Sequence, residues 1–242
     1  MEKSTKTAFI IGTSGIGKKL FLPLSELGFT DVVVTYHLDN SAADEWTHSA
    51  IPLGIRATAI QLDATDPASV KKIVADTVNA IGRIDAVIVL LGSFLSKPPT
   101  TYSPEEWQSL FATNVHAPYY IAQQTLPHLE KTHGSLLFFG VAHADQLHSQ
   151  PMTMPYAAAK TALLVMMRTL ARVEAQFGVR INMISPGLID NGKQAITDFD
   201  KIVPSGKAGT AEDINAAVRY LLSEQAVYVT GTNLIVSGGW AI

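Results

Sequence analysis

A tyrosine and a lysine four residues apart are the side chains best placed, by type and spacing, to do chemistry. Tyr156 and Lys160 open a stretch with a helical pattern. On a helix, residues at this spacing project from the same face, about one turn apart. A tyrosine has a pKa of roughly 10, and a cation beside it favours the phenolate, so the pair could transfer a proton near neutral pH. A solvated pair on a helix surface has the same spacing, so the rest of the chain must decide.

The segments around this pair predict a parallel α/β fold. Short runs that are apolar at nearly every position alternate with helical patterns, and such runs suit strands buried on both faces of a sheet. Strands are predicted at 9–11, 32–34, 57–62, 87–91, 136–139, 181–184 and 234–236. Helices are predicted at 15–27, 42–49, 67–81, 104–129 with a bend at Pro118, 156–177 and 211–223. We expect one Rossmann-type domain over 1–242, a doubly wound parallel sheet of about seven strands flanked by helices.

Composition narrows the class of protein. The chain has 242 residues, of which 47% are hydrophobic and 16% charged, enough for one domain with a sizeable core. A net charge of −3 offers no basic surface for nucleic acid or an anionic membrane. The absence of cysteine excludes disulfides, thiolate catalysis and cysteine metal sites, and we expect no metal site. With a short polar start and no run long enough to span a bilayer, a cytoplasmic location is expected.

A glycine-rich turn follows the first predicted strand. It reads Gly12-Thr13-Ser14-Gly15-Ile16-Gly17 and leads into a predicted helix. Glycines there permit a tight turn and let backbone N–H groups approach a phosphate, which the positive end of the helix also favours. The turn therefore predicts a dinucleotide site, although a plain strand-to-helix connection is the alternative.

The residues after the second predicted strand bear on the choice of dinucleotide. A site that prefers NAD usually places a carboxylate here for the ribose 2′-hydroxyl, whereas this chain has Tyr36 and His37, with Asp39 too far on. His37, Lys18 or Lys19 could help to bind a 2′-phosphate. We therefore favour NADP(H) over NAD(H), with the alternative that His37 is only an exposed loop residue.

Two acidic residues follow the third predicted strand. Asp66 and Pro67 have the pattern of a helix N-cap followed by proline at the first helical position. This explains Asp66 and leaves Asp63, at the strand end, free to contact a ligand.

In their order and spacing, these motifs resemble the short-chain dehydrogenase/reductase family over nearly the whole chain. The glycine turn resembles TGxxxGIG, and Tyr156 with Lys160 matches YxxxK. Further matches are Asp63-Ala64, Gly92 at the end of NNAG, Asn114 as the helix asparagine of the tetrad, NxxxPGxI at 182–189, and closing motifs at 206–214, 229–231 and 237–240.

The resemblance implies a catalytic role for three residues. Tyr156 would protonate the substrate oxygen during reduction, or act as the base in the reverse direction. Lys160 would bind the nicotinamide ribose and favour the phenolate. Asn114 would order a water that connects Lys160 to solvent.

The resemblance also implies a cofactor site along the same edge. Ile189 would offer its backbone amide to the nicotinamide carboxamide, with Pro186 and Gly187 shaping the wall. The implied cofactor residues are Gly12, Ser14, Ile16, Gly17, Tyr36, His37, Asp63, Ala64, Gly92, Tyr156, Lys160, Pro186, Gly187 and Ile189.

The sequence departs from the family pattern near the cofactor. The glycine turn is one residue short, with Ile11 in place of the usual threonine, and it lacks the arginine that often marks NADP binding. Val89, Leu90 and Leu91 replace the usual Asn-Asn-Ala, so we expect an apolar wall beside the cofactor.

The third departure concerns the catalytic serine of the family. Alignment from the fifth strand places Val141 at that position, whereas counting back from Tyr156 places His143 there. His143 could donate a hydrogen bond in place of the serine, and Asp145 could bind an amine or a pterin-like ring. Members of the family that reduce C=N bonds also lack the serine. The alternative is that His143 and Asp145 are solvated loop residues.

The sequence also gives expectations for the oligomeric state and for a substrate lid. The predicted helix 156–177 carries two apolar stripes, one from Ala159 to Leu170 and one from Leu164 to Ala171, which would both need cover. By resemblance we expect a homo-oligomer, a dimer or a homotetramer, with burial inside one subunit as the alternative. A short polar substrate lid is expected near 190–204.

The sequence therefore predicts an NAD(P)(H)-dependent oxidoreductase that transfers hydride between nicotinamide and a small carbonyl substrate, such as a ketone or 3-oxoacyl compound. The alternatives are a C=N reductase acting on a pterin-like or imine substrate, and a cofactor-binding pseudoenzyme with a regulatory role.

Overall fold

The computed structural model describes residues 5–12, 16–38, 40–147, 149–190 and 199–240, which contain one parallel sheet. Its seven strands lie in the order β3-β2-β1-β4-β5-β6-β7. The strands are β1 (Lys6–Ile11), β2 (Phe29–Tyr36), β3 (Arg56–Gln61), β4 (Ala86–Val89), β5 (Ser135–Phe139), β6 (Arg180–Pro186) and β7 (Asn233–Val236). All neighbouring pairs are parallel, so the carboxyl ends of the strands meet at one edge. The predicted fold class is confirmed.

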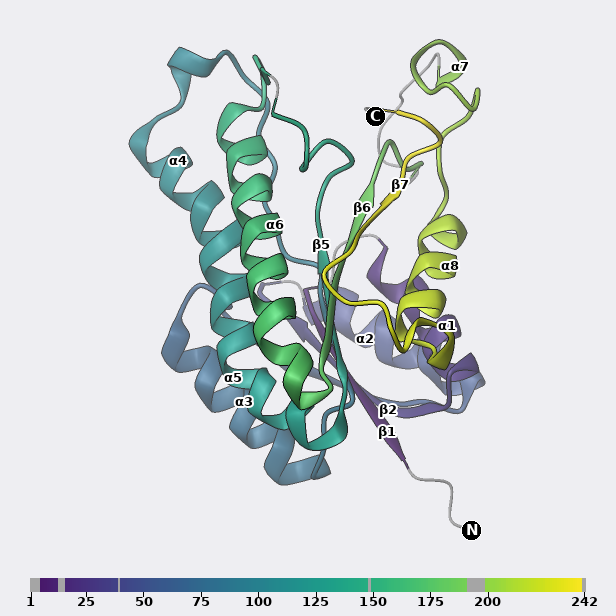
Figure 1. The fold of residues 1–242 in the computed structure, drawn as a ribbon. Helices are drawn as coiled ribbons and strands as arrows, with labels where there is room; N and C mark the ends of the chain where they lie inside the picture. The colour runs from purple at the N-terminus through teal and green to yellow at the C-terminus, as the bar shows by residue number, and fades with distance from the viewer. Residues whose placement is uncertain (1–4, 13–15, 39, 148, 191–198, 241–242) are drawn as a thin grey trace.

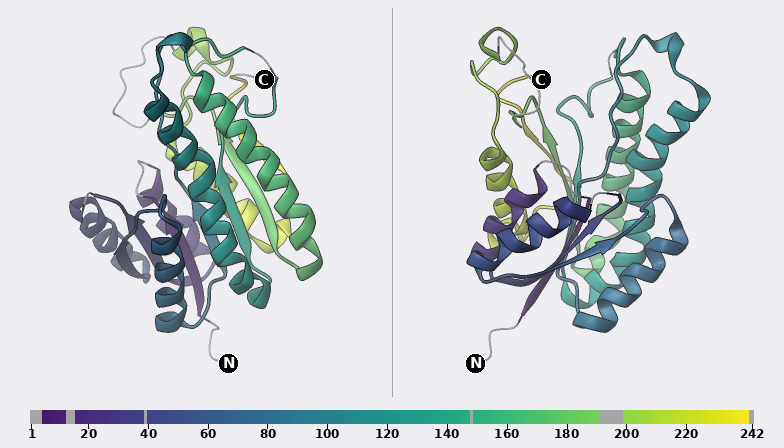
Figure 2. Two further views of the ribbon diagram at one scale, coloured as in Figure 1. Left: turned by 90° about the vertical axis from the view of Figure 1, so that its left-hand side faces the viewer. Right: turned by 180° about the vertical axis from the view of Figure 1, so that it is seen from behind.

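Helices cover both faces of the sheet. They are α1 (Phe21–Glu26), α2 (Asn40–Ala50), α3 (Pro67–Ile81), α4 (Pro104–Phe111), α5 (Ala117–Thr132), α6 (Met154–Glu174), α7 (Phe199–Ile202) and α8 (Ala211–Leu222). One face is covered by α3 to α6 and the other by α1, α2 and α8 (Figures 1 and 2). No helix among the described residues combines the length and apolar character needed to cross a bilayer.

Alternate residues of the central strands enter two separate cores. Phe9 and Phe138 belong to the cluster under α3, α5 and α6, whereas Ile10 and Leu137 belong to the cluster under α1, α2 and α8. A strand with both faces covered needs apolar side chains at every position. This double burial is the reason for the continuous apolar runs in the sequence.

The segment from α4 to α5 differs from the predicted helix 104–129 with a bend at Pro118. A π-helical segment, Ala112–His116, interrupts the helix just before Pro118, which lies in the first turn of α5. Proline is tolerated there because the first N–H groups of a helix have no intrahelical partner. The interruption therefore belongs to the segment that carries Asn114, and π-turns of this kind often occur at functional sites.

The apolar stripes of α6 face the interior of the same subunit. Leu163 of the first stripe and Leu164 and Met167 of the second lie in one core cluster, and Met166 packs against it. Both stripes therefore contribute to packing within the subunit, Met166 and Leu170 only in part, and the assembly of the protein stays a prediction.

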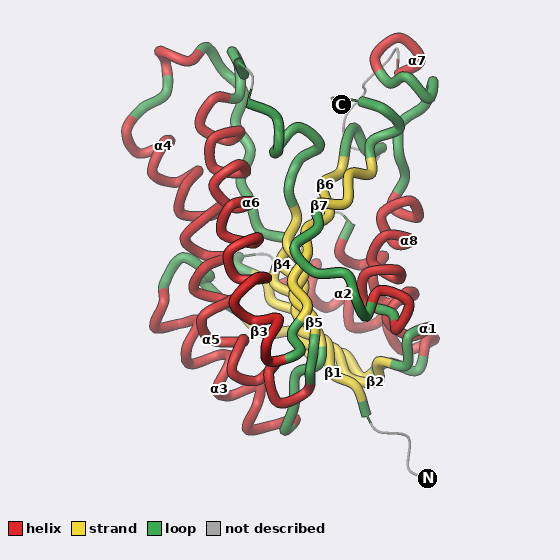
Figure 3. Tube along the Cα trace, viewed as in Figure 1, coloured by secondary structure: helices red, strands yellow, loops and turns green. Residues whose placement is uncertain are grey.

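The segments that follow the strands gather at the carboxyl edge of the sheet, where loops dominate (Figure 3). Asp66 caps α3 as predicted, accepting hydrogen bonds from the amides of Ala68 (3.0 Å) and Ser69 (3.1 Å). The predicted first helix instead begins as a 3-10 turn, Gly17–Leu20, before α1.

Gly17 has a packing role in this turn. Trp46 of α2 is 3% exposed and packs edge-on against Phe21. A Cβ on Gly17 would overlap the Trp46 ring and lie 2.8 Å from its Cζ2 atom. Only glycine therefore lets the turn approach α2 so closely.

The substitution Gly17→Ala is predicted to lower the free energy of unfolding by about 1–3 kcal/mol, the usual cost of overpacking a core. The double variant Gly17→Ala/Trp46→Phe, with a smaller ring, should recover part of this loss. Urea denaturation of both variants measures the effect. A Gly17→Ala protein as stable as the wild type would show that the turn has room for a side chain.

Candidate active site

Tyr156 and Lys160 lie in the first two turns of α6, at the carboxyl edge of the sheet. The Lys160 side chain is 3% exposed, and its Nζ atom lies 5.8 Å from the centre of the Tyr156 ring. Nζ donates to the carbonyl oxygen of Phe139 (2.8 Å) at the end of β5, and more weakly to that of Leu91 (3.4 Å) after β4. Lys160 is therefore buried and Tyr156 is half-buried, so the pair is not a solvated pair on the helix surface.

Burial shifts both pKa values against the charged forms. It raises the pKa of Tyr156 to about 12 and lowers the pKa of Lys160 to about 8. The phenol pKa thus moves opposite to the direction expected from a neighbouring cation, because desolvation outweighs the attraction. At neutral pH Tyr156 is a neutral phenol, the form that can donate a proton.

Asn114 lies against Lys160 with Gly92 between them. Asn114 is fully buried, and its Nδ2 atom donates to the carbonyl oxygens of Ser93 and Leu110, both at 2.9 Å. A Cβ on Gly92 would overlap Oδ1 of Asn114 and lie 2.9 Å from Nζ of Lys160. The site therefore requires glycine at this position.

The second polar atom of Asn114 lacks a protein donor. Its Oδ1 atom is buried and has no hydrogen-bond partner among the described residues. Leaving a buried acceptor unsatisfied costs free energy. A water or ligand that donates a hydrogen bond is expected at this atom.

The glycine turn begins beside this centre. Gly12 has φ +95, and its amide donates to the Thr35 hydroxyl at 3.1 Å. The Leu91 side chain would lie 3.2 Å from a Cβ at Gly12, so an apolar residue borders the turn, as predicted. Ile16 and Gly17 complete the described part of the turn, whereas Ser14 lies outside the described residues.

The residues expected near the adenosine lie at the ends of β2 and β3. Asp63 is less free than expected, because its Oδ1 atom accepts hydrogen bonds from the Thr65 amide (2.9 Å) and hydroxyl (2.6 Å). These bonds lower the pKa of the Asp63 carboxyl group. His37 is exposed, Tyr36 is half-buried, and Ala64 is buried.

The segment after β6 presents a backbone amide. Gly209 donates to the carbonyl of Leu188 (2.9 Å) and accepts from the amide of Asp190 (2.8 Å). In this parallel pairing the residue between them, Ile189, turns its own N–H away from Gly209. Pro186 and Gly187 precede it, and the Gly187 amide is bonded to Val236 (2.9 Å).

A cavity of about 490 Å³ lies beside Tyr156. Its lining consists of Phe94, Val141, His143, Gln150, Thr153, Tyr156, Gly187, Leu188 and Trp240. The Phe94 ring packs edge-on against Tyr156 with centres 5.0 Å apart, and the His143 and Trp240 rings lie 5.9 Å apart. Both positions predicted for the missing serine, Val141 and His143, therefore border this cavity.

Asp145 does not border the cavity. Its side chain is exposed and accepts a long hydrogen bond from Asn233 (3.5 Å). Sequence reasoning also missed Phe94, Gln150 and Thr153, which belong to no motif. Phe94 had one signal, its place two residues after Gly92. Among the described residues, no group of His, Asp or Glu side chains is arranged to hold a metal ion.

This chain is similar to a known protein family and to known enzymes over nearly its whole length. The family model described as enoyl-(acyl carrier protein) reductase matches residues 10–241. Glucose 1-dehydrogenase 2 of Bacillus subtilis is 29% identical over 246 residues, covering 98% of this chain and 95% of that protein. The 3-oxoacyl-(acyl-carrier-protein) reductase FabG of Escherichia coli is 28% identical over 247 residues, covering 99% of this chain and 98% of that protein.

A solved structure agrees with these matches. A blue fluorescent protein from a metagenomic library, in complex with NADPH, is similar with a TM-score of 0.89 and 29% identity over 98% of both chains. Because the family model spans nearly the whole chain, and these relatives share its length and fold, the chain belongs to the short-chain dehydrogenase/reductase family of NAD(P)-dependent oxidoreductases.

Proposed function

We propose that this enzyme transfers hydride between NADP(H) and a small, uncharged carbonyl compound, a ketone or 3-oxoacyl derivative. The observation that carries the proposal is the neutral Tyr156 phenol on the wall of a cavity of about 490 Å³, with Lys160 buried behind it. Apart from Tyr156, the only titratable side chain among the described residues of this wall is His143. Such a lining suits an uncharged substrate.

The residues present fit a nicotinamide dinucleotide. The observation in favour is the buried, unsatisfied Oδ1 atom of Asn114 close to Gly92 and Lys160. The proposed cofactor residues are those that the family resemblance implies, from Gly12 to Ile189 in the sequence. The free N–H of Ile189 would face the nicotinamide end. When bound, the dinucleotide supplies or accepts the hydride.

NADP(H) is favoured over NAD(H). Among the described residues at the end of β2 and just after it, Tyr36, His37 and Leu38 include no carboxylate to repel a 2′-phosphate. His37 is exposed there and could donate a hydrogen bond to that phosphate. The similar blue fluorescent protein is in complex with NADPH.

Tyr156 is the proposed general acid in reduction. Its raised pKa keeps the proton on the phenol until the substrate oxygen gains negative charge. Lys160, whose Nζ is held by the carbonyls of Phe139 and Leu91, would stabilise the phenolate that forms after proton transfer. Asn114 would hold the water that returns a proton to Lys160.

His143 is the proposed replacement for the serine of the family. It lines the same cavity as Tyr156, and a ring N–H there could donate to the substrate oxygen. The same arrangement is compatible with C=N reduction, in which a less polarised substrate is protonated by Tyr156. A C=N reductase is therefore the second candidate function.

We also propose that the protein is a cytoplasmic homo-oligomer, a dimer or tetramer. Apolar side chains remain exposed on neighbouring helices: Val165 of α6 is 62% exposed, Val173 of α6 is 49% exposed, and Tyr119 of α5 is 44% exposed. Exposed apolar side chains on adjoining helices favour an interface between subunits. The polar substrate lid near 190–204 stays a prediction, since 191–198 lie outside the described residues.

NADPH is expected to raise the melting temperature of the protein more than NADH does. A ligand at 100 times its Kd stabilises the native state by about 2.7 kcal/mol, which corresponds to a shift of several degrees. Thermal-shift titrations with both dinucleotides measure the preference. Absence of a shift with either would overturn the cofactor assignment, and a larger shift with NADH would reverse its preference.

Tyr156→Phe is predicted to lower kcat by about 10²–10⁴-fold, the usual share of a positioned general acid, while NADPH binding is kept. The assay follows NADPH oxidation with ethyl acetoacetate, ethyl benzoylacetate and the cyclic imine 2-methyl-1-pyrroline. Tyr228→Phe is the matched control, since that ring is 99% exposed. Turnover of the imine alone would favour the second candidate function, and an unchanged rate in Tyr156→Phe would remove Tyr156 from the chemistry.

A further inference from the structure

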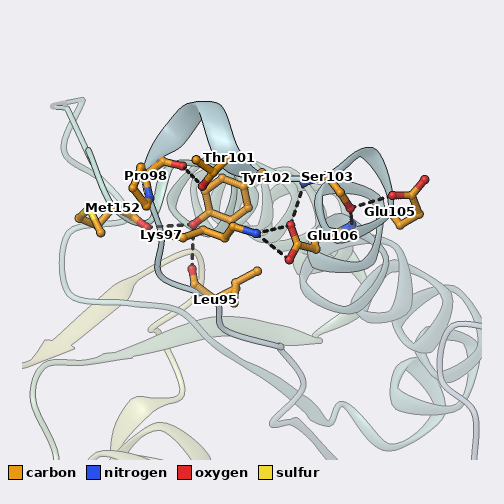
Figure 4. Close-up of polar contacts among 9 residues, drawn as sticks. All are labelled: Leu95, Lys97, Pro98, Thr101, Tyr102, Ser103, Glu105, Glu106 and Met152. Atoms are coloured by element: carbon orange, nitrogen blue, oxygen red, sulfur yellow. Dashed lines mark hydrogen bonds and ion pairs between the residues drawn. The ribbon is translucent and has the colours of Figure 1, made fainter.

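Outside the cavity, the hydroxyl of Tyr102 contacts two chain segments that border it. The Tyr102 hydroxyl lies 3.0 Å from the carbonyl oxygen of Leu95 and 2.9 Å from that of Met152 (Figure 4). Leu95 follows Phe94, and Met152 precedes Thr153, and both of these neighbours line the cavity. Tyr102 therefore contacts each segment one residue away from the cavity lining.

The same two segments share a backbone hydrogen bond. The amide of Lys97 donates to the carbonyl oxygen of Met152 at 2.8 Å, so this carbonyl faces two donors. A phenol has only one proton to donate, and Tyr102 must share it between the Leu95 and Met152 carbonyls. We call these contacts of Tyr102 and Lys97 with Leu95 and Met152 the junction. Removal of the Tyr102 hydroxyl therefore weakens the junction, whereas the backbone hydrogen bond from Lys97 remains.

The Tyr102 ring is fixed from the side of α4. Nζ of Lys97 lies 5.5 Å from the ring centre and donates to both carboxylate oxygens of Glu106, at 2.8 and 2.7 Å. Glu106 also accepts from the Ser103 amide (2.8 Å) in the capping box that starts α4. Figure 4 shows the ring, the ion pair and the cap side by side.

Removal of the Tyr102 hydroxyl tests the junction better than removal of the Lys97–Glu106 ion pair does. Lys97 and Glu106 have side chains 27% and 35% exposed, so solvent screens their attraction. The Tyr102 hydroxyl, in contrast, contacts both cavity-bordering segments directly. Its loss should change their separation more than the loss of the ion pair does.

We propose that Tyr102 is a positioning residue that holds the Phe94 segment at a fixed distance from the Thr153 segment, and thereby sets the size of substrate that reaches Tyr156. Phe94 is the moving wall: it is 58% exposed and packs edge-on against the Tyr156 ring. A looser junction lets Phe94 withdraw and admits a bulkier group beside the reacting carbonyl. This inference rests on the proposed function.

Tyr102→Phe tests the proposal with two substrates that differ only beside the ketone. Ethyl acetoacetate carries a methyl group there, and ethyl benzoylacetate carries a phenyl ring. The ratio of kcat/KM between the phenyl and methyl substrates is expected to rise about 2- to 10-fold in the variant, the factor that one net hydrogen bond corresponds to. Most of the change should lie in KM, because Tyr156 and Lys160 are untouched.

Hydrogen exchange gives a second readout that does not depend on turnover. In Tyr102→Phe, the amides of 93–103 and 150–154 should exchange faster, whereas those of α3 should not. Tyr228→Phe is the control for loss of an exposed phenol hydroxyl and should change neither quantity. Melting temperatures of the variants verify that the fold is retained.

The outcomes separate this inference from the proposed function. An unchanged substrate ratio in a folded Tyr102→Phe protein overturns the positioning role, even if exchange is faster. If the wild type binds NADPH but reduces neither ester, the proposed substrate class fails. In that case hydrogen exchange tests whether Tyr102 holds the two segments together. Unchanged exchange in Tyr102→Phe overturns this role, and faster exchange in both segments supports it.

Discussion

The burial of the Lys160 ammonium is the constraint on which the rest of the site depends. A cation taken out of water is costly unless polar groups surround it. Here the carbonyl of Phe139 at the end of β5 and that of Leu91 after β4 lie within hydrogen-bond distance of Nζ. Because β4 and β5 are neighbouring parallel strands, their carboxyl ends supply both acceptors from one edge. The sheet order therefore creates the place where the lysine can be buried.

The chemistry follows from this environment. The exclusion of water that lowers the pKa of Lys160 also raises that of Tyr156. A neutral phenol with such a raised pKa is an acid that releases its proton only when negative charge develops on the substrate. A cation close to the phenol then stabilises the phenolate. The cavity wall and the Tyr102 junction would then decide which carbonyl compounds come near enough to receive that proton.

Much of the fold could be predicted from local pattern. The bounds of α3 followed from Asp66 and Pro67 at its start, and the strands followed from apolar runs that only double burial explains. A bend was predicted at Pro118, but the π-helical segment Ala112–His116 was not. Asn114 of this segment donates to the Ser93 carbonyl, a contact between segments distant in sequence that local pattern does not contain.

The sequence indicated which residues meet around Lys160 better than it indicated their electrostatics. The spacing of Tyr156 and Lys160 indicated a shared helix face, but the direction of the phenol pKa depends on burial, which helical spacing does not contain. Likewise Phe94 and Trp240 come from distant loops and line one cavity only in the folded chain. Asp145, two residues after His143 of the cavity wall, is exposed to solvent instead.

The most direct test of the central role of Lys160 burial compares the wild type with Lys160→Met by urea unfolding at pH about 7 and about 10. Burial lowers the pKa of Lys160 from its ordinary value of 10.5 to about 8. Between these values the unfolded chain binds more protons than the folded chain, so the stability of the wild type rises with pH there. This gain in the free energy of unfolding is complete above the unfolded pKa of 10.5, and it is lost as the pH falls through the folded pKa of about 8.

The variant lacks this titration. The free energy of unfolding of the wild type, measured relative to Lys160→Met, should therefore increase on the order of 2 kcal/mol between the two pH values. A difference that stays constant or becomes smaller as the pH rises would show that Lys160 is not buried as a desolvated cation, and would contradict the account.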